Sequence, residues 1–213
     1  LRLHLGAMVV VTDVAVWHLS DLARLRAAAR GGDVNKLAEL LARRIMMTGP
    51  VTVAEYMATA LGHPEHGYYT TRDPFGRAGD FITAPEISQI FGELIGLWFV
   101  TVWEQIGSPT KFNLVELGPG RGTLIVDALR AAMQVPAFLD GAELVLLETS
   151  RVLRASQAES LAAYDPVWCD SFDGVPDGPI LAIGNEFFDA LPVHQFVRTP
   201  RGWRERLIAW DET

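Results

Sequence analysis

The spacing of the apolar residues changes once along the chain. Between residues 33 and 106 apolar residues recur at helical spacing, and we expect helices over 33–47, 52–61 and 83–106. From residue 108 short apolar runs alternate with amphipathic stretches. These runs predict strands at 112–117, 143–148, 166–169, 179–184, 193–198 and 203–210, with helices at 122–133 and 150–163. Strand, glycine-rich turn, helix and strand in this order indicate an α/β fold with a doubly wound parallel sheet.

Capping residues support the helix boundaries in the first half. Thr52 with Glu55, and Thr83 with Glu86, have the spacing of a capping box, and Pro85 suits the first turn of the second helix. Between these helices the sequence HPEHGYYTTRDPFGRAGDFIT is rich in glycine, proline and aromatic residues and predicts a loop.

Composition excludes several classes of function. The chain has 213 residues and a net charge of −8, which argues against a broad nucleic-acid surface. Cys169 has no second cysteine to pair with, so a reducing compartment, the cytoplasm, is expected. Residues 1–33 are apolar but interrupted by charge, and they predict neither a membrane span nor a clear signal peptide. His63 and His66 have no further ligands nearby in the loop, so no metal site is predicted.

The turn LVELGPGRGT after the first predicted strand is a candidate ligand site. Its spacing is G-x-G-x-G, whereas a dinucleotide fingerprint needs a third glycine where Thr123 stands. Glu116 would repel a pyrophosphate but favours a cationic ligand such as S-adenosylmethionine (SAM). Arg121 suits either a phosphate or the methionine carboxylate. The candidate residues of the strand and turn are Glu116, Gly118, Pro119, Gly120, Gly122 and Thr123.

Polar residues follow the next three predicted strands. Glu148 could accept hydrogen bonds from both ribose hydroxyls, and Asp170 could accept one from an adenine amino group. After the fourth strand, Asn185, Glu186 and Asp189 are candidates to hold the acceptor group, with Glu186 orienting a guanidinium or accepting its proton. Solvated strand ends and a simple helix cap are the alternatives for these positions.

Four longer motifs together resemble one family. These are HPEHGYYTTRDPFGRAGDFITAPEISQIFGE, VELGPGRGT, LLETS and NEFFDALPVHQFV, which occur in this order within residues 36–210. They resemble the MidA-like class I SAM-dependent methyltransferases, a group that includes mitochondrial complex I assembly arginine methyltransferases.

The resemblance implies a Rossmann-like methyltransferase sheet of seven strands, with SAM as the cofactor and S-adenosylhomocysteine as its product. It implies a protein substrate methylated on arginine, for which Asn185, Glu186 and Asp189 are the catalytic candidates from their position in the chain. It also implies that a family element lies over the cofactor cleft, formed by Gly79, Asp80, Phe81, Thr83, Pro85, Glu86, Ser88 and Gln89.

The chain departs from this family at both ends. Residues 1–33 match no family motif, and the sequence stops at AWDET before seven strands can be completed, so we expect a missing C-terminal part. The expected division is an N-terminal extension (1–33), a helical region with a cleft-covering loop (34–107) and a SAM-binding core (108–213). A non-catalytic assembly or binding module and an NAD-dependent dehydrogenase are the alternative functions. The mitochondrial matrix is the alternative compartment, and the oligomeric state is open.

Overall fold

The computed structural model describes residues 9–11, 33–71 and 83–210, with side chains described from residue 36 onward. The described residues form two compact units. One lies within Leu1–Thr71 and Ala190–Thr213, and the other lies within Arg72–Asp189. This division differs from the one expected from sequence, because the long helix before residue 107 belongs with the parallel sheet and the last strands belong with the N-terminal helices.

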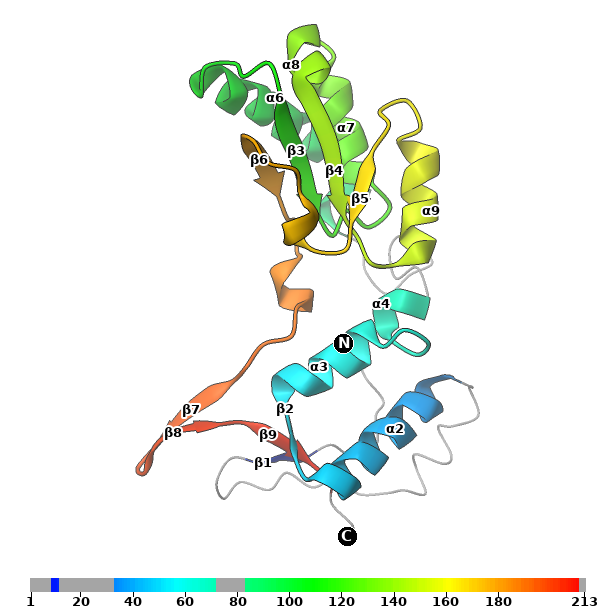
Figure 1. Cartoon of the computed structure of the whole chain (residues 1–213), viewed down its shortest axis with the longest axis vertical. Coiled ribbons are helices and arrows are strands. Elements are labelled where there is room, and N and C mark those ends of the chain that lie inside the picture. The colour runs from blue at the N-terminus through cyan, green and yellow to red at the C-terminus, as the bar shows by residue number, and fades with distance from the viewer. Residues whose placement is uncertain (1–8, 12–32, 72–82, 211–213) are drawn as a thin grey trace. The chain divides into compact units, whose positions relative to one another are not determined.

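A parallel sheet organises the second unit (Figure 1). Its strand order is β5-β4-β3-β6, and its strands are β3 (Phe112–Leu117), β4 (Ala142–Leu147), β5 (Val167–Cys169) and β6 (Ile180–Ile183). All neighbours pair in parallel, and each strand falls within a residue or so of its predicted bounds. The doubly wound α/β class expected from sequence is therefore confirmed.

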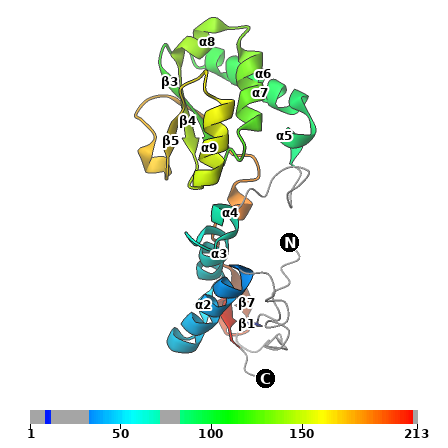
Figure 2. The same ribbon diagram turned by 90° about the vertical axis from the view of Figure 1, so that its right-hand side faces the viewer.

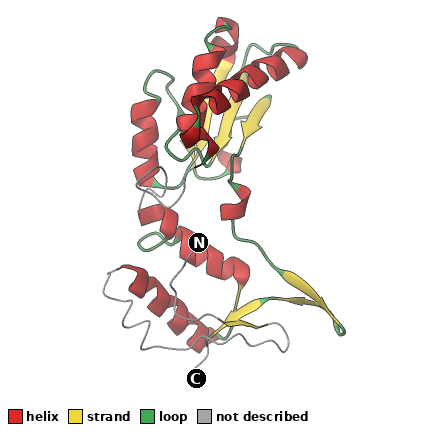
Figure 3. Cartoon of the chain, turned by 180° about the vertical axis from the view of Figure 1, so that it is seen from behind, coloured by secondary structure: helices red, strands yellow, loops and turns green. Residues whose placement is uncertain are grey.

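Both faces of this sheet are covered, which explains why its central strands are apolar at almost every position. Leu114 and Leu146 pack against α6 (Gln89–Gln105) and α7 (Thr123–Ala132), which lie in front of the strands in Figure 3. Val115 and Val145 point to the opposite face, where Val175 lies on the connection from β5 to β6. The connections that follow β3 and β5 thus lie on opposite faces of the sheet.

Helices α6 and α7 approach each other closely because α6 carries glycine at the contact. A Cβ atom built on Gly96 would lie 2.2 Å from the carbonyl oxygen of Ala128 on α7. A Cβ on Gly92 would lie 2.6 Å from the Cβ of Asp127. A side chain at either position would push the helices apart.

The helix expected over 83–106 is broken, and its capping box is absent. The short α5 (Ala84–Ile87) ends at Ser88, which has an extended backbone, before α6 begins. Thr83 is the N-cap of α5 but makes no side-chain capping hydrogen bond. The prediction was wrong here because the Glu86 side chain binds Thr123 instead. Figure 2 shows α5 next to α6 and α7, both of which it contacts.

Shorter elements complete the second unit. The helix expected over 150–163 is α9 (Arg151–Ser160), and α8 (Pro136–Gly141) was not predicted. The 3-10 helix η2 (Phe172–Gly174) follows β5, and η3 (Phe188–Ala190) follows β6 at the boundary between the two units.

The other unit joins segments from both ends of the chain. Its helices are α2 (Asp33–Thr48), α3 (Val53–Gly62) and α4 (Tyr68–Thr71), the last within the predicted loop. An antiparallel sheet has the order β1-β9-β2, formed by Val9–Val11, Leu207–Ala209 and Val51–Thr52. Its core contains Leu41, Ile45, Val51, Tyr56 and Ile208. The capping box of Thr52 and Glu55 at the start of α3 is confirmed.

The strand expected over 203–210 is two strands. β7 (Phe196–Thr199) and β8 (Gly202–Glu205) form a hairpin, whereas β9 pairs with β1 and β2. Neither pairing joins the parallel sheet. Across the described part of the chain, we find no helix that is both long and apolar enough to cross a membrane.

Candidate functional site

The glycine turn between β3 and α7 has a backbone that other residues adopt with difficulty. Gly118, Gly120 and Gly122 have φ angles of 63°, 57° and 81°, all in the left-handed region. Side chains with a Cβ are strained there, whereas glycine is not. The turn is closed by a hydrogen bond from the Gly122 N–H to the Pro119 carbonyl oxygen, 2.8 Å, and Gly122 is the N-cap of α7. The first turn of α7 therefore begins directly at this loop.

The loop after β6 lies against the glycine turn. A Cβ atom on Gly118 would approach the Phe187 ring to 2.6 Å, so the two loops touch. β3 and β6 are neighbours in the sheet, and the connections after β3 and β5 cover opposite faces. Ligands of open α/β sheets bind at such a switch point, beyond the carboxyl ends of the strands.

Glu116 is buried beneath this turn. Its side chain is 2% exposed and accepts a hydrogen bond from the backbone N–H of Ile125 in α7. Among the described residues, its Oε2 atom has no hydrogen-bond partner. Burial raises the pKa of this carboxyl to about 8, so the group is mostly protonated at neutral pH. The charged strand end expected from sequence is therefore, in the folded chain without ligand, a buried and largely neutral acid.

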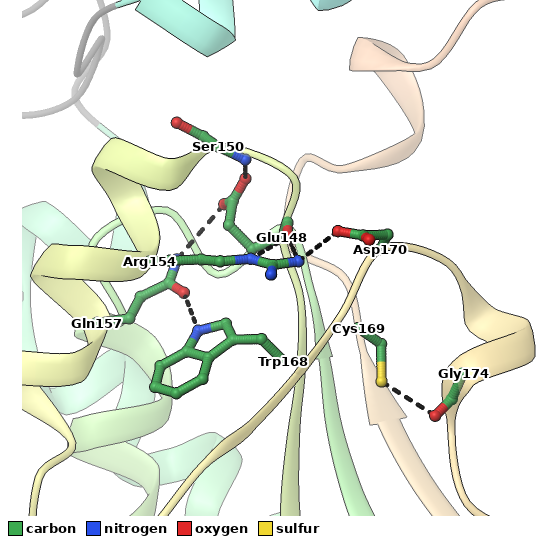
Figure 4. Close-up of polar contacts among 8 residues, drawn as sticks. All are labelled: Glu148, Ser150, Arg154, Gln157, Trp168, Cys169, Asp170 and Gly174. Carbon is green, nitrogen blue, oxygen red and sulfur yellow. Dashed lines mark hydrogen bonds and ion pairs between the residues drawn. The ribbon is translucent and has the colours of Figure 1, made fainter.

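Glu148 lies at the end of β4, and its carboxylate is held by the protein on both sides (Figure 4). The backbone N–H of Ser150 donates to its Oε1 at 2.8 Å, and Gln157 donates to its Oε2 at 3.4 Å. Burial raises the pKa of Glu148, and these hydrogen bonds act in the opposite direction. A carboxylate has about four lone-pair positions, so it keeps capacity for a ligand hydroxyl.

Two residues of α9 that sequence reasoning missed connect these strand ends. Gln157 is fully buried and also donates to the carbonyl oxygen of Gly120, at 2.6 Å. Arg154 donates to the carbonyl oxygen of Glu148 at 2.7 Å through Nε, and its Nη2 lies 2.6 Å from Asp170 Oδ1. Their spacing of three residues on a helix was the available signal, but it does not reveal which loops they reach.

Asp170 and two of the three candidate residues after β6 are open to solvent. The side chain of Asp170 is 83% exposed although one oxygen binds Arg154. Glu186 and Asp189 are exposed, and Asn185 is partly buried. Glu186 has a φ of 52°, a strained value for a residue that is not glycine. Strained backbone of this kind is concentrated at functional sites, so it marks the loop after β6 as a candidate site.

The segment before α6 contributes one predicted residue to the turn. The Thr123 hydroxyl donates to Glu86 Oε1 at 2.7 Å, and Arg121 Nη1 lies 3.8 Å from Glu86 Oε2. The Gln89 side chain instead donates to Glu93, along α6. Thr83 caps α5 with its backbone alone, while Gly79, Asp80 and Phe81 lie outside the described residues.

We find no cluster of three or more potential metal ligands among the residues that the structure describes. His63 and His66 stack with ring centroids 5.1 Å apart. His194 pairs with Glu205 at 2.5 Å, in the unit that does not contain the glycine turn.

Comparison with known proteins adds family evidence to this geometry. Residues 94–213 match a family model described as "Putative S-adenosyl-L-methionine-dependent methyltransferase". The mitochondrial protein arginine methyltransferase NDUFAF7 of Homo sapiens is 45% identical over 192 residues, 79% of this chain and 44% of that protein. Its Mus musculus counterpart is 44% identical over 220 residues, 92% of this chain and 50% of that protein. The chain spans about half the length of these curated relatives.

A solved structure shares the fold. A crystal structure of a Burkholderia thailandensis protein bound to S-adenosyl-homocysteine is 30% identical to this chain and superposes with a TM-score of 0.69. The match covers 83% of this chain and 47% of that one.

Proposed function

This chain belongs to the S-adenosyl-L-methionine-dependent methyltransferase family, and from that premise we propose that it binds SAM at the glycine turn and methylates an arginine side chain of a protein. The arginine acceptor is the substrate that the names of the NDUFAF7 relatives give for those proteins. The observation that carries the proposal is the meeting of the glycine turn with the loop after β6 at the switch point of the sheet.

The residues around the turn fit this cofactor. Glu148 offers a buried carboxylate, positioned at the end of the strand beside the turn, for the two hydroxyls of a ribose. Glu116 has a buried oxygen without a partner among the described residues, and a nearby cation would favour its charged form. Backbone N–H groups and an N-terminal helix turn at the glycines suit a carboxylate. A cationic group of the cofactor would therefore lie near Glu116, and its carboxylate near the backbone N–H groups of the turn.

The loop after β6 would hold the acceptor. The cofactor supplies a methyl group on a sulfonium sulfur. Asn185, Glu186 and Asp189 would orient the acceptor nitrogen for in-line attack, since catalysis of such a displacement rests mainly on positioning. The exposed carboxylate of Glu186 can bind a guanidinium and accept its proton, and Asp189 adds a second exposed carboxylate nearby in sequence.

Titration calorimetry tests the cofactor assignment. We expect the chain to bind SAM and S-adenosylhomocysteine and to bind NAD far more weakly. Binding of NAD without either adenosyl ligand would support the dehydrogenase alternative and overturn the proposal.

A tritiated-methyl assay tests the acceptor assignment. We expect Glu186→Gln to lower methyl transfer to protein by about a hundredfold, the scale of a lost general base, while SAM affinity changes less than about twofold. Glu159→Gln, an exposed carboxylate on α9, is the matched control and should leave transfer unchanged. SAM binding without any transfer by the unmodified chain would instead identify a non-catalytic binding module.

We also propose a compartment from the same comparisons. The relatives named above are mitochondrial proteins, which supports the mitochondrial alternative over the cytoplasmic prediction. Fractionation of cells that produce the protein would distinguish the two compartments.

A further inference from the structure

We propose that Gln157 is a positioning residue that holds the glycine turn and the Glu148 carboxylate in one fixed arrangement for the ribose of the cofactor. The proposal rests on the SAM site described above but concerns a side chain that is buried behind it. Gln157 is fully buried, and its amide contacts the glycine turn, Glu148 and Trp168; Figure 4 shows the last two contacts.

The three partners of Gln157 define the orientation of its amide. The indole N–H of Trp168 on β5 can only donate, and it lies 2.8 Å from Oε1 of Gln157. The carbonyl oxygen of Gly120 can only accept, and it lies 2.6 Å from Nε2. A flipped amide would place donor against donor and acceptor against acceptor. The remaining Nε2 hydrogen therefore points to Glu148 Oε2, at 3.4 Å.

This arrangement couples two groups that would bind the same ligand. Gly120 lies in the glycine turn, and its carbonyl fixes the orientation of the adjoining peptide groups. One carboxylate oxygen of Glu148 accepts a hydrogen bond from the backbone N–H of Ser150, and the other accepts one from Gln157. These two donors fix the orientation of the carboxylate plane. A ribose bound between the glycine turn and Glu148 requires a constant distance between these two groups. The buried amide of Gln157 maintains this distance.

A hydrophobic or acidic residue could not replace this amide. Leucine would leave the Gly120 carbonyl, the Trp168 indole and one Glu148 oxygen without a partner, and buried polar groups without partners are costly. Glutamate would bring a second carboxylate to Glu148 and an acceptor to the Gly120 carbonyl. The residue is therefore specified by hydrogen-bond polarity rather than by volume.

Calorimetry with S-adenosylhomocysteine tests the inference through a double-mutant cycle. We expect Gln157→Leu and Glu148→Gln each to weaken binding by tenfold or more, and the double variant to lose clearly less affinity than the product of the two single losses. Independent losses that multiply in the double variant would overturn the inference, as would unchanged affinity in Gln157→Leu. Failure of the unmodified chain to bind S-adenosylhomocysteine would instead overturn the proposed function.

Two further measurements separate positioning from a merely structural role. Trp168→Phe keeps an aromatic ring but removes the N–H donor to Gln157, so it should weaken binding several-fold in a chain that folds. Gln157→Leu also removes a hydrogen bond that lowers the pKa of Glu148, whereas Arg154 and the backbone donors remain. The pH midpoint for loss of binding should consequently move upward in Gln157→Leu and stay in place in Glu159→Gln. An unmoved midpoint with unchanged affinity in Trp168→Phe would contradict the inference.

Discussion

At the scale of single residues, Glu116 makes the folded protein sensitive to pH. Burial raises its pKa to about 8 from an ordinary value of 4.5. Between these values the native state keeps a proton that the unfolded chain has released. The free energy of unfolding therefore decreases as pH rises through this window, by at most about 1.4 kcal/mol per pH unit for one group.

We expect Glu116→Gln to flatten this decrease. The amide has nearly the shape of the protonated carboxyl but cannot lose its proton. Urea unfolding of both proteins between pH 5 and 8 measures the slopes. Glu148 contributes in the same direction, because its pKa is also raised, so some slope should remain. Equal slopes in the two proteins would show that Glu116 ionises freely in the native state.

The location of the candidate residues was predictable where chemistry and chain position coincide. Glu116, Glu148 and the glycines stand at strand ends, and the structure places them at the switch point. Gln157 was not predictable, because a polar residue within an amphipathic helix ordinarily faces solvent. Its burial depends on Trp168 and Gly120, which are distant in sequence and meet it only in the folded sheet.

At the scale of secondary structure elements, two identical capping patterns have different outcomes. Thr52 and Glu55 form both hydrogen bonds of the capping box at the start of α3. Thr83 has the same spacing to Glu86, but Glu86 binds Thr123, which is 37 residues further along the chain. A local pattern predicts a local bond only when no distant partner competes for the side chain.

The two threonines provide a matched pair for a stability test. Thr52→Ala removes a capping hydrogen bond and should reduce the free energy of unfolding by about 1 kcal/mol. Thr83→Ala removes no capping hydrogen bond and should reduce the free energy of unfolding by only a few tenths of a kcal/mol. Thermal unfolding of both variants measures the difference. A larger loss from Thr83→Ala would mean that its hydroxyl caps α5 in solution.

The contact between α6 and α7 gives a second prediction for an element. Gly96→Ala places a Cβ against the α7 backbone, and we expect a loss of roughly 1–3 kcal/mol in the free energy of unfolding, typical of overpacking. Gly62→Ala at the end of α3 is the control, because a Cβ there meets no atom within 4 Å. Denaturant unfolding measures the free energy of unfolding of both variants. An unchanged value in Gly96→Ala would show that α6 and α7 can move apart without cost.

At the scale of the whole molecule, the pairing of distant segments was the part that sequence could not predict. Apolar periodicity located β9, but not its pairing with β1 and β2 from the other end of the chain. Strand propensity is local, whereas partner choice depends on which apolar surfaces remain uncovered after folding. The parallel pairing of β3 with its neighbours was easier to predict, since strands alternate with helices in this part of the chain.

The division into two units predicts where a ligand changes stability. The glycine turn, Glu116 and Glu148 all belong to the unit within Arg72–Asp189. Saturating S-adenosylhomocysteine should stabilise this unit by about 2.7 kcal/mol at a hundred times its Kd. Hydrogen exchange should therefore slow in β3 and β4 while α2 and α3 exchange at unchanged rates. Equal protection of α2 and α3 would show that the two units open as one.

The left-handed backbone of Gly118, Gly120 and Gly122 also restricts how the gene can vary. Asparagine tolerates this conformation better than most residues, but a glycine codon becomes an asparagine codon only after two base changes. Single base changes that replace the glycine lead instead to residues with a Cβ, mostly ill-suited to left-handed backbone. Aspartate is the partial exception, and it would add negative charge where the carboxylate of the cofactor is proposed to bind. The turn is therefore a point of low mutational tolerance, enforced by the genetic code as well as by sterics.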